Sequence, residues 1–260
     1  MATTIKPWAD TPFKLIPTPG ESDDVNTLSA IVWVAREMAC AHNGMLRGLN
    51  SVYQQCIFVH EAKDIEDLLL YTKFWCDWID EHHEGEETIF FPQVEIVTGV
   101  EGLMAKNVAQ HHAFLPGLQK LKKYTSETKA GNYTGEELRR VVDEFGAMLT
   151  RHLTEEIATL LDLEAYDAKA LKVAYVEFDE AMRQGEKVRA VSILNSLANK
   201  GYRAFFTRLS WEHRMLTSRE QMIGHQCRFS FGISYIIGLS GHIKEFGDSH
   251  PQRLGGRSEH

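Results

Sequence analysis

Six side chains of types that bind metal ions stand where helical faces would bring them together. Four are histidines from widely separated stretches, and two of these are followed four residues later by a glutamate. The six residues are His42, His82, Glu86, His111, His152 and Glu156. Residues i and i+4 of a helix point the same way, so each His-x-x-x-Glu pair can offer one nitrogen and one carboxylate oxygen to a shared site. Imidazoles and carboxylates converging inside a helical bundle are typical of di-metal proteins.

The apolar surroundings of the four histidines favour one binding partner shared by all of them. Each of the four histidines lies on the apolar stripe of its stretch, and a buried polar group without a partner costs about 1–3 kcal/mol. A metal ion would satisfy all four. The alternative is a set of buried histidines that hydrogen-bond to Glu86, Glu156 and tyrosines without metal. A single His-x-x-x-Glu match is weak evidence in a chain with 12 histidines, so the prediction depends on all four stretches together.

Two of the histidines belong to doublets, and helical periodicity selects one member of each. His82 and His111 continue the apolar spacing of the residues before them, so His83 and His112 are expected at the rim of the site or behind the ligands. Substitution of His82 or Glu86 by alanine should then remove most bound metal, whereas substitution of His83 should not. Nearby acidic residues are expected on a solvated face, although two of them could orient an imidazole through its free N–H: Glu87 and Glu155.

The elements that would position these residues are helices. Apolar residues recur at spacings of three and four in four stretches, the pattern of a helix with one buried face. The stretches run from Leu28 to Val52, from Leu68 to a stop near Gly99, from Met104 to Leu118, and from Leu138 to Leu160. In the last stretch the buried side is expected to include Phe145 and Met148.

Local signals predict where some of these helices begin and end. Asn26 is a suitable N-cap for the first helix, and Thr134 followed by Glu137 is a capping-box pattern before the fourth. Pro116 predicts a kink or an early end in the third, because its ring removes a backbone hydrogen bond.

The fold class that follows is all-α, an up-down four-helix bundle with a mainly helical C-terminal extension. Residues 26–163 contain no sustained alternation of polar and apolar residues, so strands are not needed. We expect a proline-rich extended lead at residues 1–25, the bundle at residues 26–165 and the extension at residues 166–260. Within the extension, residues 170–182 and 188–206 are predicted helical, and the last forty or so residues show no clear period.

Composition narrows the class of protein. The chain has 260 residues, 43% of them hydrophobic, and a formal net charge of -8 without a block of lysine and arginine, so nucleic acid is not an expected partner. No apolar run reaches the roughly 20 residues that span a bilayer, and the N-terminus lacks the layout of a signal peptide. The cysteines are dispersed, which favours reduced thiols and a cytoplasmic location: Cys40, Cys56, Cys76 and Cys227.

Residues 5–165 resemble the hemerythrin-like, or HHE cation-binding, proteins, in particular their fungal cytosolic branch. Four motifs in the same order carry the resemblance. They are His42-Asn43 with Arg47-Gly48-Leu49-Asn50-Ser51, His82-His83 through Glu86-Glu87 to Phe90-Phe91-Pro92, Gln110-His111 with Phe114, and His152-Leu153 with Glu156-Ile157.

The resemblance implies a four-helix bundle that holds a non-haem di-iron centre. By the same resemblance, His42 and His82 would bind one iron, His111 and His152 the other, and the two glutamates would bridge them. Manganese and zinc also suit imidazole and carboxylate ligands. One position departs from the oxygen-carrying members, which have a second histidine one turn after the third-helix ligand, where this chain has Leu115.

The departure at Leu115 shapes the functional hypotheses. With fewer nitrogen ligands, more coordination positions on the metals stay open for water, dioxygen or substrate, which favours activation of dioxygen over its reversible carriage. The first hypothesis is therefore a di-iron oxidoreductase or oxygenase acting on a small aromatic or polyketide-like metabolite of fungal secondary metabolism. Alternatives are a non-catalytic iron or oxygen sensor or iron buffer, and a metal-free interaction module. Four aromatic residues could wall a substrate pocket, or could be simple core: Tyr71, Trp75, Trp78 and Phe145.

Overall fold

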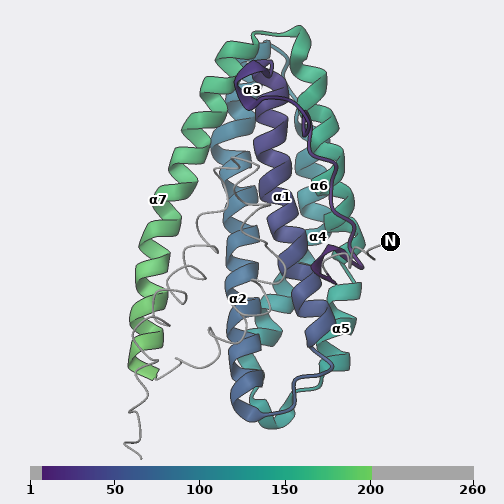
Figure 1. The fold of residues 1–260 in the computed structure, drawn as a ribbon, viewed down its shortest axis with the longest axis vertical. Helices are drawn as coiled ribbons and strands as arrows, with labels where there is room; N and C mark the ends of the chain where they lie inside the picture. Colours follow the sequence, from purple (N-terminus) through teal and green to yellow (C-terminus); the bar gives the residue numbers. More distant parts are fainter. Residues whose placement is uncertain (1–7, 201–260) are drawn as a thin grey trace, which may run out of the picture.

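The computed structural model describes residues 8–200, with side chains to residue 185, and in this range the chain is helical and contains no strand (Figure 1). The predicted all-α fold is confirmed. The α-helices are α1 (Ala30–Gln55), α2 (Ala62–Gly85), α3 (Phe91–Thr98), α4 (Ala105–Glu127), α5 (Gly135–Asp143), α6 (Gly146–Leu161) and α7 (Ala168–Lys200). A π-helical segment, Glu86–Phe90, joins α2 to α3, so the chain runs as one helical rod to a left-handed cap at Gly99.

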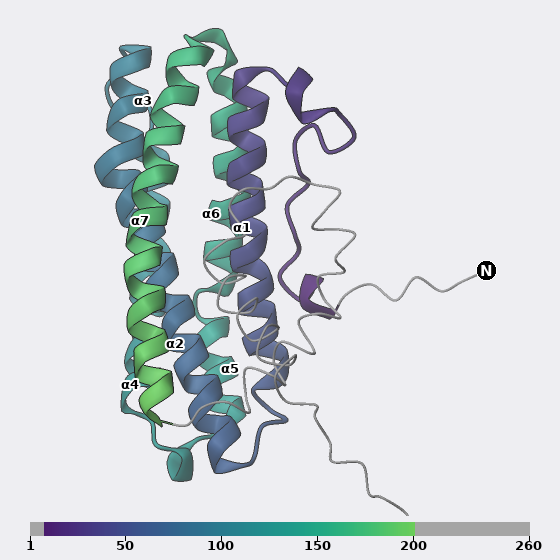
Figure 2. The same ribbon diagram turned by 60° about the vertical axis from the view of Figure 1, so that its left-hand side comes forward.

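The bundle consists of α1, α2, α4 and α6, which run alongside one another, while α7 packs outside them along α1, α2 and α3 (Figures 1 and 2). The N-terminal lead follows the surface of α1. Buried asparagines of α1 hold it there: Asn43 Oδ1 accepts a hydrogen bond from the backbone N–H of Ile16 at 2.7 Å, and Asn50 Oδ1 accepts one from Phe13 at 2.9 Å. Side-chain amides thus replace the backbone partners that the extended lead lacks.

The ends of two helices test the predicted caps. The hydroxyl of Ser29, not Asn26, caps α1, where it accepts a hydrogen bond from the N–H of Val32 at 3.3 Å. The prediction of Asn26 was wrong because Asp24 caps a separate 3-10 turn that includes Asn26, and its Oδ1 accepts from the Asn26 N–H at 3.0 Å. The cap of α5 is confirmed, since Thr134 Oγ1 accepts from the N–H of Glu137 at 3.3 Å.

Pro116 lies inside α4, and the helix continues past it to Glu127. The predicted early end was therefore wrong. Pro116 and His112, whose carbonyl loses its partner, lie on the exposed side of the helix, where water can satisfy that oxygen. On the other side, a Cβ at Gly117 would collide with the side chain of Phe145, so this glycine allows α4 to approach the start of α6.

The fourth predicted stretch is divided into two helices. It is interrupted between Asp143 and Gly146, where Phe145 has a φ of −133°. Met148, predicted to be buried, is 42% exposed and Leu149 is buried instead, while His152 and Glu156 lie on the buried face as predicted. Met148 and Leu149 lie three and four residues after Phe145, so both fit a helical period and the pattern alone could not decide between them.

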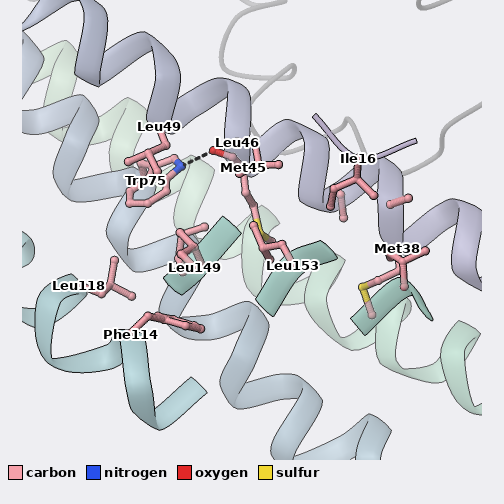
Figure 3. Close-up of a cluster of buried hydrophobic side chains, with 14 of the residues drawn as sticks. Ile16, Met38, Met45, Leu46, Leu49, Trp75, Phe114, Leu118, Leu149 and Leu153 are labelled. Carbon is pink, nitrogen blue, oxygen red and sulfur yellow. Dashed lines mark hydrogen bonds between the residues drawn. The ribbon is translucent and has the colours of Figure 1, made fainter. Parts of the chain in front are cut away.

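The core is continuous through the bundle (Figure 3). Trp75 is buried at its centre and donates a hydrogen bond from Nε1 to the carbonyl of Met45 at 3.0 Å, with Phe145 6.5 Å away between ring centroids. Trp75 and Phe145, considered as walls of a substrate pocket, are therefore core residues. Across residues 8–200, none of the helices combines the length and the apolar character needed to cross a bilayer.

The first half of α7 belongs to the same core. Leu171, Ala174, Tyr175 and Phe178 are buried with the residues of the bundle. The helix predicted at residues 170–182 is confirmed as part of α7. The helix predicted at residues 188–206 lies within α7 up to Lys200, and its last six residues and the tail lie outside the described residues. The domain boundary at residue 165 stays a prediction.

The cysteines agree only in part with the expectation of reduced thiols. Cys56 and Cys76 are free and buried. Burial raises the pKa of both thiols, which keeps them protonated and unreactive. Cys40, in contrast, is disulfide-bonded, and Cys227 lies outside the described residues.

Candidate metal centre

The structure brings all six sequence-predicted residues into one buried cluster. α1 contributes one histidine, α4 another, and α2 and α6 each contribute a histidine, with a glutamate one turn later. Every one of them is at most 3% exposed: His42, His82, Glu86, His111, His152 and Glu156. The one-turn spacing of each His–Glu pair places both side chains on the inward face, as i, i+4 geometry requires.

The four predicted histidines form two close pairs. The Nε2 atoms of His42 and His82 are 3.4 Å apart, and those of His111 and His152 are 3.0 Å apart. Two neutral imidazole nitrogens cannot both present lone pairs at this distance without repulsion, whereas a cation between them would be bound by both. The division into pairs is the one that the family resemblance implied.

Each glutamate lies between the two pairs. Glu86 Oε1 is 2.8 Å from Nε2 of His82, and its Oε2 is 3.5 Å from Nε2 of His111. The second glutamate reaches one histidine of each pair in the same way, from Glu156 Oε2 to His42 Nε2 at 3.7 Å and to His152 Nε2 at 3.3 Å. A carboxylate so placed can bridge two metal ions.

Hydrogen bonds on the outer ring nitrogens orient the imidazoles. His42 Nδ1 donates to the carbonyl of Leu153 at 2.9 Å, and His111 Nδ1 donates to Glu87 Oε1 at 2.7 Å. A protonated Nδ1 leaves the Nε2 lone pair directed into the cluster, which is the form that binds metal. The orienting role predicted for Glu87 agrees with this contact.

Glu155 acts on the site through a neighbouring side chain. Its Oε2 accepts a hydrogen bond from Gln110 Nε2 at 2.8 Å, and Gln110 Oε1 lies 3.4 Å from His152 Nδ1. Lys106 and Arg151 hold the same carboxylate from the solvent side, at 2.8 and 2.6 Å. These cations and the Gln110 hydrogen bond keep the pKa of Glu155 low, at about 2.

His83 does not lie at the rim, so that part of the prediction was wrong, whereas its placement behind the ligands stays a prediction. It is 5% exposed, and its ring centroid is 4.6 Å from that of His111 and 5.0 Å from that of His152. Metal-ligating atoms of His83, Glu86, His111 and His152 all lie within 4.8 Å of one another. Periodicity did not predict the burial of His83, because it selects a single stripe and His83 lies beside that stripe. His112 is exposed, as predicted.

The electrostatics of the cluster fit a positively charged occupant. Burial lowers the pKa of His42, His83 and His152 well below the usual value, and neighbouring imidazoles lower it further, so the rings are neutral. Burial also raises the pKa of Glu86 and Glu156, and the charge of Glu86 adds to the effect on Glu156.

The two carboxylates lack the hydrogen bonds that normally stabilise buried acids. Among the described residues none of their four oxygens has a hydrogen-bond donor in good geometry, and their close neighbours are the imidazole nitrogens and each other. Buried carboxylates with neutral imidazoles around them are costly without a cation and are good ligands for one. The residues present therefore fit a pair of divalent metal ions.

Aromatic side chains from several helices surround the cluster and exclude water. Phe114 of α4 lies 4.9 Å from His83 and Phe91 of α3 stacks on His111 at 5.7 Å. From the outer helix α7, Phe178 contacts His82 at 5.6 Å between ring centroids. Sequence analysis could not predict this last contact, because it joins the bundle to a helix beyond the predicted boundary.

Comparisons with known proteins identify the family of this chain. Residues 35–163 match the sequence profile of the family described as Hemerythrin HHE cation binding domain. Over 177 residues, 67% of each chain, the sequence is 39% identical to the dimeric xanthone biosynthesis cluster protein R11 of Cryptosporiopsis sp. (strain 8999). No solved structure matches the chain. The profile match contains the whole cluster.

Proposed function

This chain belongs to the hemerythrin HHE cation-binding family, and from that membership we propose that it holds two iron ions and uses them to activate dioxygen. The observation that carries the proposal is the pair of buried glutamates, each within 3.7 Å of one histidine from either pair. A metal-free interaction module would have no reason to bury two carboxylates without hydrogen-bond donors. Iron is the metal that the family resemblance implies.

The roles of the protein side chains follow from their contacts. Four of the imidazoles and the two carboxylates would hold the metals: His42, His82, His111, His152, Glu86 and Glu156. Reduced iron, when bound, supplies electrons to dioxygen. Glu87 and the carbonyl of Leu153 keep protons on the outer nitrogens of two imidazoles, so that their inner nitrogens stay available to the metals. The phenylalanines exclude water, which protects reactive species from side reactions.

We infer an aromatic, polyketide-like metabolite as the substrate class. The support is the relative with 39% identity, whose name places it in a xanthone biosynthesis cluster. The number of imidazoles does not by itself separate activation from carriage, because His83 also lies among the residues that could hold a metal. Activation is supported instead by the biosynthesis cluster named for the relative. The side of the cluster nearest to solvent is at His111, whose partner Glu87 has a side chain 32% exposed. Oxidant or substrate would approach there.

Oxygen uptake by the iron-loaded protein tests the proposal. Protein loaded anaerobically with Fe(II) is mixed with oxygenated buffer, with and without aromatic polyketides such as hydroxylated xanthones and anthraquinones. We expect catalytic oxygen consumption with at least one substrate and none with Glu86→Gln. Stoichiometric, reversible uptake without turnover would support a carrier or sensor instead. Metal content below about half an equivalent per chain would contradict the di-iron centre itself.

A further inference from the structure

We propose that His83 is a metal ligand, and that it supplies the third imidazole of the metal position formed with His111, His152 and Glu86. The inference rests on the di-metal centre of the proposed function and does not depend on oxygen activation. It assigns the centre five histidines, three at one position and two at the other.

The hydrogen bonding of His83 gives it the form that a ligand needs. Its Nδ1 donates to the carbonyl of Ile79 at 2.7 Å, so Nε2 carries a lone pair. Nε2 is buried and has no hydrogen-bond partner within the described residues. The ring is held edge-on between His111 and Phe114, at 4.6 and 4.9 Å between centroids. A histidine kept only for packing would need a donor for this nitrogen, and the cluster around it offers other lone pairs instead.

Helical geometry explains how adjacent histidines can serve one centre. Consecutive residues of an α-helix are rotated by about 100°, so His82 and His83 point to different places. His82 faces the group with His42, and His83 faces the group with His111 and His152. Glu86 is four residues after His82 and three after His83, and both spacings bring side chains together. It belongs to both groups, as a bridging ligand must.

α4 could not have supplied a second imidazole at position 115, where the oxygen-carrying members of the family have a histidine. Leu115, one turn after His111, is 38% exposed and faces away from the cluster. Phe114 points inward instead, is 1% exposed and lies 5.6 Å from His152 between ring centroids. The inward space on α4 is therefore filled by an apolar ring, and the nitrogen donor comes from α2.

Iron binding by two matched variants tests the assignment. His83→Gln removes the buried member of one doublet, and His112→Gln removes the exposed member of the other. We expect the wild-type protein and His112→Gln to bind two irons each, and His83→Gln to lose one of them through an affinity decrease of about 100-fold or more. Leu115→His in the His83→Gln background should not restore the second iron.

A spectroscopic count of ligands keeps the test decisive if His83→Gln does not fold. Co(II) takes the same donors, and in the Co(II)-loaded wild-type protein each ligating imidazole contributes one strongly shifted, exchangeable N–H proton resonance. Five such resonances would support the assignment. Four resonances, or two irons with unchanged affinity in His83→Gln, would overturn it while leaving the di-metal centre intact. Failure of the wild-type protein to bind metal would overturn the di-metal centre as well.

Discussion

Glu87 accepts a hydrogen bond from Nδ1 of His111 at 2.7 Å, although the residue before it, Glu86, faces the interior of the cluster. Two consecutive glutamates thus serve the same centre from opposite sides. Glu86 and Glu87 begin the π-helical segment, and π-helical turns are frequent at functional sites. Glu86 contacts the inner nitrogen of His111, and Glu87 holds the outer one.

The first prediction concerns this outer contact. Burial lowers the pKa of His111 to about 4, and Glu87 partly offsets that effect. Replacing Glu87 by alanine frees the ring to rotate and should weaken iron binding by about 10–100-fold. Glu84→Ala, on the exposed side of the same helix, is the control and should leave the affinity unchanged. Equal affinities of both variants for Fe(II), measured by titration, would contradict an orienting role of Glu87.

The second prediction concerns metal removal. A ligand that binds only the folded protein stabilises it by about 2.7 kcal/mol at 100 times its dissociation constant. For a chain of this size that corresponds to a rise in melting temperature of about 5–10 °C. We expect this rise when Fe(II) is added anaerobically to chelator-treated protein, followed by circular dichroism. Glu156→Gln should abolish it, since it removes a ligand common to both histidine pairs.

The metal-free form of Glu156→Gln provides a control on folding. Burial raises the pKa of Glu156, and its carboxyl oxygens have no hydrogen-bond donor in good geometry within the described residues, so the amide loses no such bond. This variant should therefore melt no lower than the metal-free wild-type protein at pH 7. A much lower melting temperature would show that Glu156 has a structural role independent of metal.

The third prediction concerns pH. Burial raises the pKa of Asp67 to about 6, which its ion pair with Lys63 at 3.5 Å only partly opposes. A raised pKa in the folded state means that the stabilisation is complete below pH 3.8 and is lost as pH rises through about 6. Asp67→Asn should therefore raise the free energy of unfolding by about 1–3 kcal/mol at pH 7.5 and leave it unchanged near pH 4. Urea unfolding at both pH values measures this.

The exposed neighbour Glu66 provides the comparison for Asp67. Glu66→Gln removes one negative charge from the same helical turn, but that charge is exposed. Its effect on the free energy of unfolding should therefore stay within about 0.5 kcal/mol at either pH. If Asp67→Asn were destabilising at pH 7.5, the ion pair with Lys63 would outweigh the cost of burial.

The fourth prediction concerns α7. Phe178 is buried and packs on His82, Phe90 and Tyr175. Phe178→Ala should cost about 3–5 kcal/mol of stability through the cavity it leaves. Because this cavity adjoins a ligating imidazole, it should also make bound iron more accessible to chelators. Val173→Ala, at an exposed position of the same helix, should change neither property. Rates of iron transfer to a chelator and urea unfolding provide the two measurements.

Much of the architecture could be predicted because helical periodicity reports directly on burial. The histidines and glutamates that were placed on apolar stripes do lie in the interior, and Thr134 caps α5 as its motif indicated. The errors arose where one local feature displaced another. Asp24 caps a separate turn that contains Asn26, and Leu149, four residues after Phe145, is buried in place of Met148, three residues after it.

The composition of the site was harder to predict than its location. A stripe one residue wide cannot contain both members of a doublet, so periodicity placed His83 at the rim or behind the ligands. Glu86 follows His82 by four residues and His83 by three, and both spacings bring side chains of a helix together. The contact of Phe178 with His82 could not be predicted either, because the spacing of residues within a helix does not show which distant helix packs against it.

The depth of the cluster has a consequence for how the protein acquires and loses its metals. All seven potential donors are at most 5% exposed, so a chelator or carrier cannot replace them around the metals while the bundle is closed. Exchange then requires the helices to separate transiently, and its rate is set by the frequency of that local opening. The lifetime of the metal-loaded protein would depend on how often the bundle opens locally rather than on the surrounding iron concentration. Dioxygen, a molecule of two atoms, needs a far smaller opening.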